Sequence, residues 1–159
     1  QAQSSTNRMY KNSPAEPFCG AVLQEQILIC GVIHMTTDEI MFWNDYPKML
    51  PLYEKISSVL EKRYPNMSIK VSKTQISFYN RHMFAMVSTS KKRKKDRPKE
   101  FVMLSVGLPY PLDHPRVLTS VEAYPGRWTH HIALTHEAEM DDELLEWIDA
   151  AYQFSESKR

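Results

Sequence analysis

The chain has 159 residues, which suits one domain with a tail and allows about two thirds of the unfolded surface to be buried. Its 20 lysines and arginines nearly balance its 19 aspartates and glutamates, so no strong overall field attracts nucleic acid. Two cysteines and four glycines argue against a disulfide framework, a cysteine zinc site and a glycine-rich phosphate loop. The apolar runs are shorter than the about 20 residues of a membrane span, so we expect no membrane segment, and the number and placement of the cysteines suit a cytoplasmic protein.

The first 34 residues differ in character from the rest of the chain. Residues 1–17 are polar, contain prolines and show no apolar period, which is typical of a disordered leader. The stretch AVLQEQILICGVIH suits either a strand or a short helix. We interpret residues 1–34 as a poorly structured or spurious N-terminal extension. One domain is expected over residues 35–155.

Helices are predicted at both ends of this domain. Thr36 and Glu39 have the spacing of a capping box and open a first helix. A second helix is expected from Pro51 to Pro65, with apolar residues at i, i+4, i+7 and i+8: Leu52, Ile56, Val59 and Leu60. A last helix follows the acidic start DDE at 141–143, with its apolar stripe at Leu144, Ile148 and Ala151.

Short strands fill the middle of the domain. Alternation predicts strands around residues 69–71 and 76–78, and two more flank the turn at Pro125 and Gly126. The segments HMFAMVS (82–88) and FVMLSVGL (101–108) are apolar at both parities, which places them at the sheet centre. Consecutive strands with short connections predict an α+β fold of two layers, an antiparallel sheet of about five to six strands with helices on one face.

The central strands also suggest a partner. If helices cover only one face, we expect the apolar side chains of Phe84, Met86, Val102 and Leu104 to need a second cover. The N-terminal segment, a ligand or a second subunit would provide it. We predict a homodimer through this face.

Three polar stretches carry a resemblance to a known family. These are KTQISF (73–78), GLPYPLDHPRV (107–117) and RWTHHIAL (127–134). With the apolar segments between them, residues 35–153 closely resemble the bacterial family called domain of unknown function 5655. The resemblance implies a small cytoplasmic domain, sometimes fused to other modules, and brings no reaction, cofactor or catalytic residue.

A ligand pocket is the function that the residues favour. If the relevant strand ends meet, guanidinium, indole, hydroxyl and imidazole groups would line one concavity for a small anionic or aromatic ligand. The alternative is that the tryptophan packs in the core while the arginines pair with Glu122 or Asp113. The candidate ligand-binding residues are Trp128, Arg127, His130, Thr74, Gln75 and Arg81.

A basic run supplies a second hypothesis. Six positive charges in seven residues could bind phosphates of nucleic acid, although no aromatic residues for base stacking interleave them. Such runs in loops are also common as solvated surface. The candidate nucleic-acid-binding residues are Lys91, Lys92, Arg93, Lys94, Lys95 and Arg97.

The histidines supply a third hypothesis, an enzyme or metal protein that uses His130 or His131. Neighbouring side chains on a strand point to opposite faces, so these two cannot easily act on one target. The sequence has neither an HExxH motif nor a G-x-S-x-G elbow. We therefore expect a non-enzymatic binding or interaction module with no metal, cofactor or catalytic residue.

Overall fold

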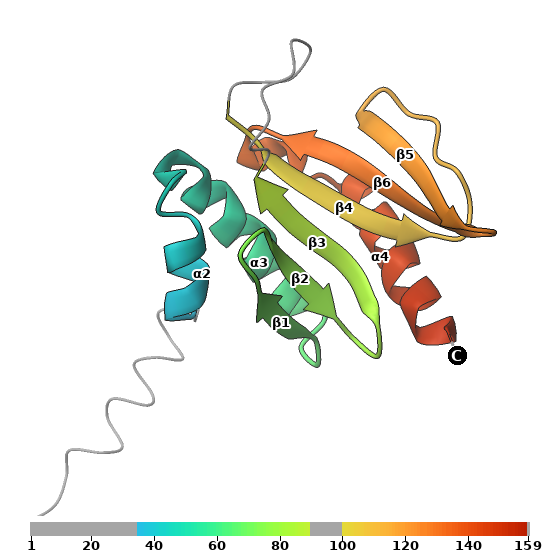
Figure 1. Cartoon of the computed structure of the whole chain (residues 1–159), viewed down its shortest axis with the longest axis horizontal. Coiled ribbons are helices and arrows are strands. Elements are labelled where there is room, and N and C mark those ends of the chain that lie inside the picture. The colour runs from blue at the N-terminus through green and yellow to red at the C-terminus, as the bar shows by residue number, and fades with distance from the viewer. Residues whose placement is uncertain (1–34, 90–99, 159) are drawn as a thin grey trace, which may run out of the picture. The chain divides into compact units, whose positions relative to one another are not determined.

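The computed structural model describes residues 35–89 and 100–158, which lie in one compact unit. A sheet of six antiparallel strands forms one layer and helices form the other, so the predicted two-layer α+β fold is confirmed (Figure 1). The predicted extension, residues 1–34, lies outside the described residues, and a domain boundary near Met35 stays a prediction.

The strands follow the order β1-β2-β3-β4-β6-β5 across the sheet. The two segments that are apolar at both parities are β3 and β4, and they occupy the two central positions, as predicted. Only the last step departs from chain order, because β6 inserts between β4 and β5. The strands are β1 (Ser68–Val71), β2 (Gln75–Tyr79), β3 (Met83–Thr89), β4 (Val102–Leu108), β5 (Val117–Tyr124) and β6 (Arg127–Leu134).

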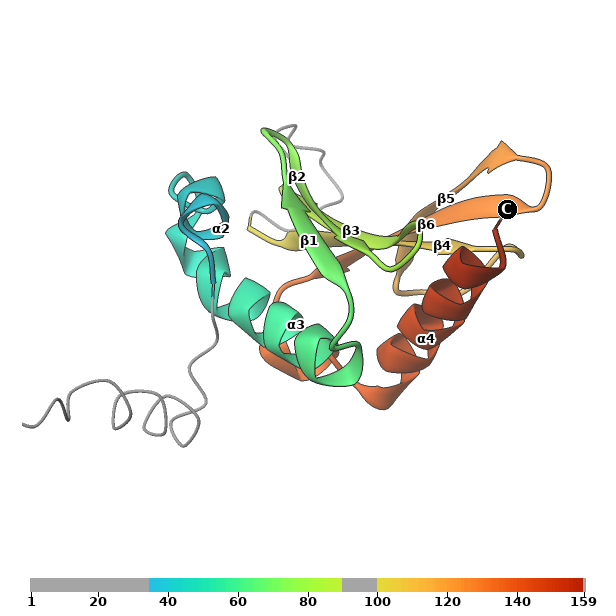
Figure 2. The ribbon, with the colours of Figure 1, turned by 90° about the horizontal axis from the view of Figure 1, so that it is seen from below.

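The two long helices, α3 (Leu50–Arg63) and α4 (Asp142–Ser157), lie on the same face of the sheet (Figure 2). Helix α4 packs on β3 and β4. Short 3-10 helices at Pro47–Met49 and Glu137–Glu139 precede the two long helices. The Asp141 carboxylate caps α4 by accepting the Leu144 N–H at 3.0 Å.

The short helix α2 (Thr37–Phe42) begins with the predicted capping box. The Glu39 N–H donates to the Thr36 hydroxyl, and the Glu39 carboxylate accepts the Thr36 N–H at 2.8 Å. Glu39 is also buried and accepts the hydroxyl of Tyr53 on α3. Burial and this carboxylate raise the pKa of Tyr53 well above its ordinary value. The box therefore also fastens α2 to α3.

The main core lies between the sheet and its helices. The buried cluster contains Ile56 of α3, Ile148 of α4 and the β4 side chains that alternate toward them. Phe84, Val102 and Leu104 belong to this cluster, so the prediction that they stand on an uncovered face is wrong. Met86 does face the other way, because it pairs with Ser105 rather than with a core residue.

A β-bulge explains the misplaced Phe84. Phe78 pairs with Ala85 but Tyr79 pairs with Met83, which leaves Phe84 as an extra residue on β3. Its ring turns to the helix side and packs edge-on against Tyr152 of α4, with 5.1 Å between the centroids. Pairing of β3 with β4 runs from Thr89 to Ala85, so beyond the bulge the two strands separate.

Candidate functional site

A pocket of about 220 Å³ lies where β3 and β4 separate. The last two residues of β4, Gly107 and Leu108, pair there with β6 alone. The C-terminal end of α4 reaches the same end of the sheet (Figure 1). The bulge thus creates an opening between neighbouring strands, which a regular sheet would have closed. Its walls include Met83, Met86, Gly107, Arg127, Phe154 and Lys158.

Two cations line this pocket. The Lys158 ammonium lies 4.6 Å from the centroid of the Phe154 ring, and its Nζ would lie 4.0 Å from a Cβ atom at Gly107. Burial, and secondly the charge of Arg127, lower the pKa of Lys158 below its ordinary value of 10.5. Among the described residues, no carboxylate pairs with either cation. The pocket therefore has a positive field that no described acid neutralises.

Hydroxyl groups complete its polar side. Ser105 and Thr129 line the pocket on neighbouring strands, on the sheet face that α3 and α4 leave free. The Ser105 Oγ lies 2.7 Å from Nδ1 of His131, its direct partner across β4 and β6. His131 thus borders the pocket through the serine. Such cross-strand polar pairs are common in sheets.

The structure brings together only some of the predicted ligand-binding residues. Arg127 and Trp128 both line the pocket. Thr74 and Gln75 lie at the other end of the sheet. Gln75 pairs with Ser88, and the strand register continues from Ser88 through β4 to Ala133, near the end of β6. Arg127 lies at the start of β6. Arg81 is exposed in the turn between β2 and β3, outside the pocket lining.

The indole of Trp128 does not share a face with Arg127. It stacks on the His130 ring at an interplanar angle of 8° and a centroid separation of 6.5 Å. His130 lies on the helix side of β6, while Arg127 and Thr129 alternate to the free face. The carbonyl oxygen of Trp128 lies 4.0 Å from the Cβ position of Gly107, on the pocket side.

His130 is a buried residue with both ring nitrogens in hydrogen bonds. Its Nε2 lies 3.0 Å from the carbonyl oxygen of Tyr110, which only accepts, so this nitrogen carries a proton. In the neutral ring, Nδ1 then accepts the Ser120 hydroxyl at 2.8 Å. With no exposed surface and both nitrogens occupied, His130 holds the 109–116 connection against β6.

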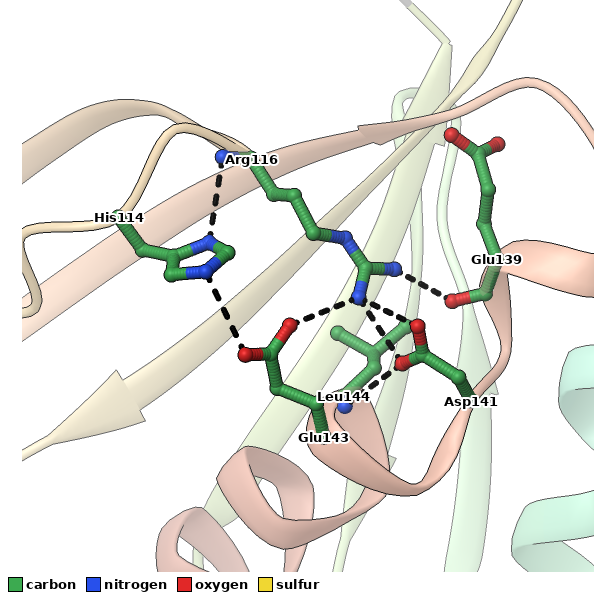
Figure 3. A network of polar contacts seen from close by, with 6 residues as sticks. All are labelled: His114, Arg116, Glu139, Asp141, Glu143 and Leu144. Carbon is green, nitrogen blue, oxygen red and sulfur yellow. Dashed lines mark hydrogen bonds and ion pairs between the residues drawn. The ribbon is translucent and has the colours of Figure 1, made fainter.

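A second polar cluster lies at the start of α4 (Figure 3). Arg116 Nη1 donates to both Asp141 oxygens at 2.9 and 2.8 Å and to Glu143 at 3.2 Å. Its Nη2 donates to the carbonyl oxygen of Glu139 at 2.5 Å. The guanidinium also lies over the Trp147 ring, 5.9 Å from its centroid. We call this the Arg116 clamp, comprising Arg116, His114, Asp141, Glu143 and the Glu139 carbonyl.

His114 joins the clamp from the same connection. Its Nδ1 accepts the Arg116 N–H at 3.3 Å, so Nε2 carries the proton and faces the Glu143 carboxylate at 3.3 Å. The Arg116 guanidinium, and then the Leu144 N–H, lower the pKa of Asp141 below 3.8. Every charge in the clamp has an opposite partner, as expected of a structural link between the 109–116 connection and α4.

Among the described residues, neither Glu122 nor Asp113 forms the predicted ion pair with an arginine. The arginines that bind acids are Arg116 and Arg63, which donates to Asp149. Glu122 instead accepts the Gly126 N–H at 3.0 Å and closes the β5–β6 turn. Gly126 adopts a φ of 70°, the left-handed region that this turn requires. The sequence analysis also missed Lys158 and Phe154 of the pocket. Lys158 falls beyond the expected domain end at residue 155, and an apolar position on a helix gives no sign that it borders a pocket.

The structure leaves two other hypotheses as predictions. The basic run from Lys91 to Arg97 lies outside the described residues. Within residues 35–89 and 100–158, no group of three histidines, cysteines or acids is arranged to hold a metal ion. In the same part of the chain no helix has the length and apolar character to cross a membrane.

Comparison with known proteins identifies the family. A family model described as a domain of unknown function, DUF5655, matches residues 41–155. The match covers α3, α4 up to residue 155, the whole sheet, the pocket up to Phe154 and the Arg116 clamp. No curated protein and no solved structure matches the chain. Because the family model spans well over half of its residues, the chain belongs to the DUF5655 family.

Proposed function

We propose that this domain is a non-enzymatic binding module whose pocket between β3 and β4 takes a small anionic ligand. The observation that carries the proposal is the pair of cations, Arg127 and Lys158, that line one pocket without a described carboxylate partner. Two like charges in a partly buried site repel each other, and an anion between them would relieve this repulsion.

Helix geometry accounts for one of these cations but not for the other. A lysine is favourable at the C-terminal end of a helix, where it faces the partial negative charge of the last carbonyls. Lys158 follows α4 directly and has this advantage. Arg127 is the first residue of strand β6, so it does not belong to a helix end. An anionic ligand would interact favourably with both cations.

The walls suit a ligand with a polar and an apolar part. Hydroxyl groups of Ser105 and Thr129 lie on the polar side, and Met83, Met86 and Phe154 supply apolar surface. Pockets that bind small molecules typically combine mostly apolar walls with a few polar groups that orient the ligand. A guanidinium offers paired donors that match a carboxylate or phosphate.

The test uses benzoate as the probe and NMR chemical shifts as the readout, at low ionic strength. We expect the Gly107 and Thr129 amide signals to shift in a saturable way. The double variant Arg127→Ala and Lys158→Ala should weaken binding at least about tenfold, because each charge-assisted hydrogen bond contributes on the order of 1.5–3 kcal/mol.

A matched double variant controls for the loss of charge. Arg81 is an exposed arginine outside the pocket, and Lys70 lies over the Tyr79 ring at 4.6 Å, the same distance as Lys158 over Phe154. Arg81→Ala with Lys70→Ala removes the same net charge and should leave benzoate binding unchanged. Equal weakening in both double variants would mean that only the overall charge attracts benzoate.

The remaining parts of the proposal concern location and assembly. We propose a cytoplasmic location and a homodimer through the free face of the sheet, where Met86 lies. Sedimentation of the full chain at micromolar concentration decides the oligomeric state. A monomer under these conditions would remove the homodimer without affecting the pocket.

A further inference from the structure

We infer that the ligand of this pocket is a small monocarboxylate with a single apolar body, an inference that rests on the anion-binding function proposed above. The polar and apolar parts of the lining, its volume and its charge each restrict the chemistry of the occupant. Together they select one class among the small anions that two cations could attract.

The volume restricts the size of the ligand. Pockets for drug-sized molecules hold roughly 300–1,000 Å³, and this one holds about 220 Å³. It has room for one ring or a short branched chain with one acid group. A nucleotide, with a base, a sugar and phosphates, is too large to be enclosed.

The chemistry of the walls excludes a second polar end on the ligand. None of the described residues that line the pocket is an aspartate or glutamate. An amino acid would leave its ammonium group without a counter-charge, and that ammonium would lie near Arg127 and Lys158. Burying an unpaired charge is costly. Apart from its acid group, the ligand therefore meets methionine and phenylalanine side chains, which suits an apolar body.

The charge of the site favours one negative charge over two. The C-terminal end of α4 borders the pocket, and its carbonyls contribute a partial negative charge that offsets part of the Lys158 charge. Sites that hold phosphate groups typically use a helix N-terminus or a cradle of backbone N–H groups. The described lining comes instead from strand sides and a helix C-terminus. A planar carboxylate matches two cations and two hydroxyls without further donors.

The experiment compares four probes that vary the ring, the ammonium group and the acid group. Benzoate has the carboxylate and a ring, acetate lacks the ring, phenylalanine adds an ammonium, and phenyl phosphate replaces the acid by a largely dianionic group at pH 8. Binding is measured by NMR titration of the full chain at constant ionic strength. We expect benzoate to bind at least tenfold more tightly than each of the other three.

One variant tests the apolar end separately from the cations. Met86→Ala shortens an apolar side chain of the lining and leaves both cations, and the Phe154 ring beneath Lys158, in place. It should weaken benzoate severalfold and leave acetate unchanged. Leu118→Ala, at an exposed position on β5 outside the lining, is the matched surface control and should change neither.

Each result has a distinct meaning. Phenyl phosphate or phenylalanine binding as tightly as benzoate would overturn the monocarboxylate class, while the anion pocket itself would stand. Acetate equal to benzoate would overturn the apolar body. If none of the four probes shifts the Gly107 and Thr129 signals, the proposed anion-binding function fails as well.

Discussion

Arg116 and Arg127 flank the same edge strand, β5, but their surroundings differ. Arg116 donates to two carboxylates and a carbonyl and lies over the Trp147 ring. Arg127 lines an open pocket beside Lys158, and no described acid pairs with it. The contrast separates a cation that holds the fold together from one that is available to a ligand.

The contrast also shows why a polar motif is a poor guide to a binding site. The Arg116 clamp contains more charged groups than the pocket, and its His114 and Arg116 lie in GLPYPLDHPRV, one of the most specific family stretches. Its charges are nevertheless satisfied within the domain (Figure 3). In the pocket it is the lack of described counter-charges that points to an external partner.

The largest expected effect is a difference in the free energy of unfolding between variants of the two arginines. Arg116→Ala should lower the free energy of unfolding by about 2 kcal/mol, because the Glu139 carbonyl loses its charged donor and Trp147 is uncovered, whereas Asp141 and Glu143 are exposed enough for water to replace the guanidinium. Arg127→Ala should change it by less than about 0.5 kcal/mol, the usual range for surface positions without partners. Urea denaturation of both variants measures the difference.

Either of two results would break the comparison. If Arg127→Ala destabilised the domain as much as Arg116→Ala, Arg127 would have a structural partner. If Arg116→Ala had no effect, the clamp would be an ordinary surface cluster, whose ion pairs contribute little. Arg81→Ala is the control for an exposed arginine outside both regions.

A smaller loss of stability is expected at His130, which the sequence analysis placed in the binding site. His130→Leu should cost about 1–2 kcal/mol, because the Tyr110 carbonyl and the Ser120 hydroxyl lose a buried partner. Benzoate binding should remain, since the ring lies on the helix side of β6. A variant of unchanged stability that no longer binds benzoate would instead place His130 in the site.

Much of the fold could be predicted because its signals are local. The capping box at Thr36, the apolar stripes of α3 and α4 and the turn at Gly126 depend on neighbouring residues. The central position of β3 and β4 followed from their apolar residues at both parities. The face of Phe84 was predicted wrongly, because strict alternation fails at a β-bulge and the sequence carries no sign of the bulge.

The pocket was harder to predict because it depends on distant contacts. Arg127 was identified, but Thr74 and Gln75 were grouped with it although the register puts them at the opposite end of the sheet. Lys158 reaches the pocket only because α4 ends beside the separated strands. Neither strand register nor the direction of a packed helix can be derived from local periodicity.

Low pH provides a further test of the clamp through Asp141, the carboxylate that also caps α4. The Arg116 guanidinium, and then the Leu144 N–H, lower its pKa in the folded state. A lowered carboxylate pKa contributes stability that is complete above the unfolded value, near 3.8, and is lost as pH falls through the folded value. Asp141→Asn keeps a capping side chain but removes the charge.

The prediction is that stability falls more steeply below pH 4 in the wild type than in Asp141→Asn. The Arg63 guanidinium similarly lowers the pKa of Asp149, so both proteins retain some acid sensitivity and the difference between their curves isolates the clamp. Urea midpoints between pH 2.5 and 7 measure it. Parallel curves would show that the Arg116 pair contributes nothing to acid stability.

The smallest effect concerns the pocket at alkaline pH. Burial, and then Arg127, lower the pKa of free Lys158 below 10.5, whereas a bound anion favours the charged ammonium. Benzoate affinity should therefore be constant below the free pKa and fall as pH rises through it. Arg127 stays charged over this range and provides the remaining affinity.

In Lys158→Met, binding should be weaker at pH 7 and independent of pH up to 10, because the titrating group is gone. If the variant kept the wild-type pH profile, another group would be responsible, and the pairing of Lys158 with the ligand would be refuted even if benzoate still bound.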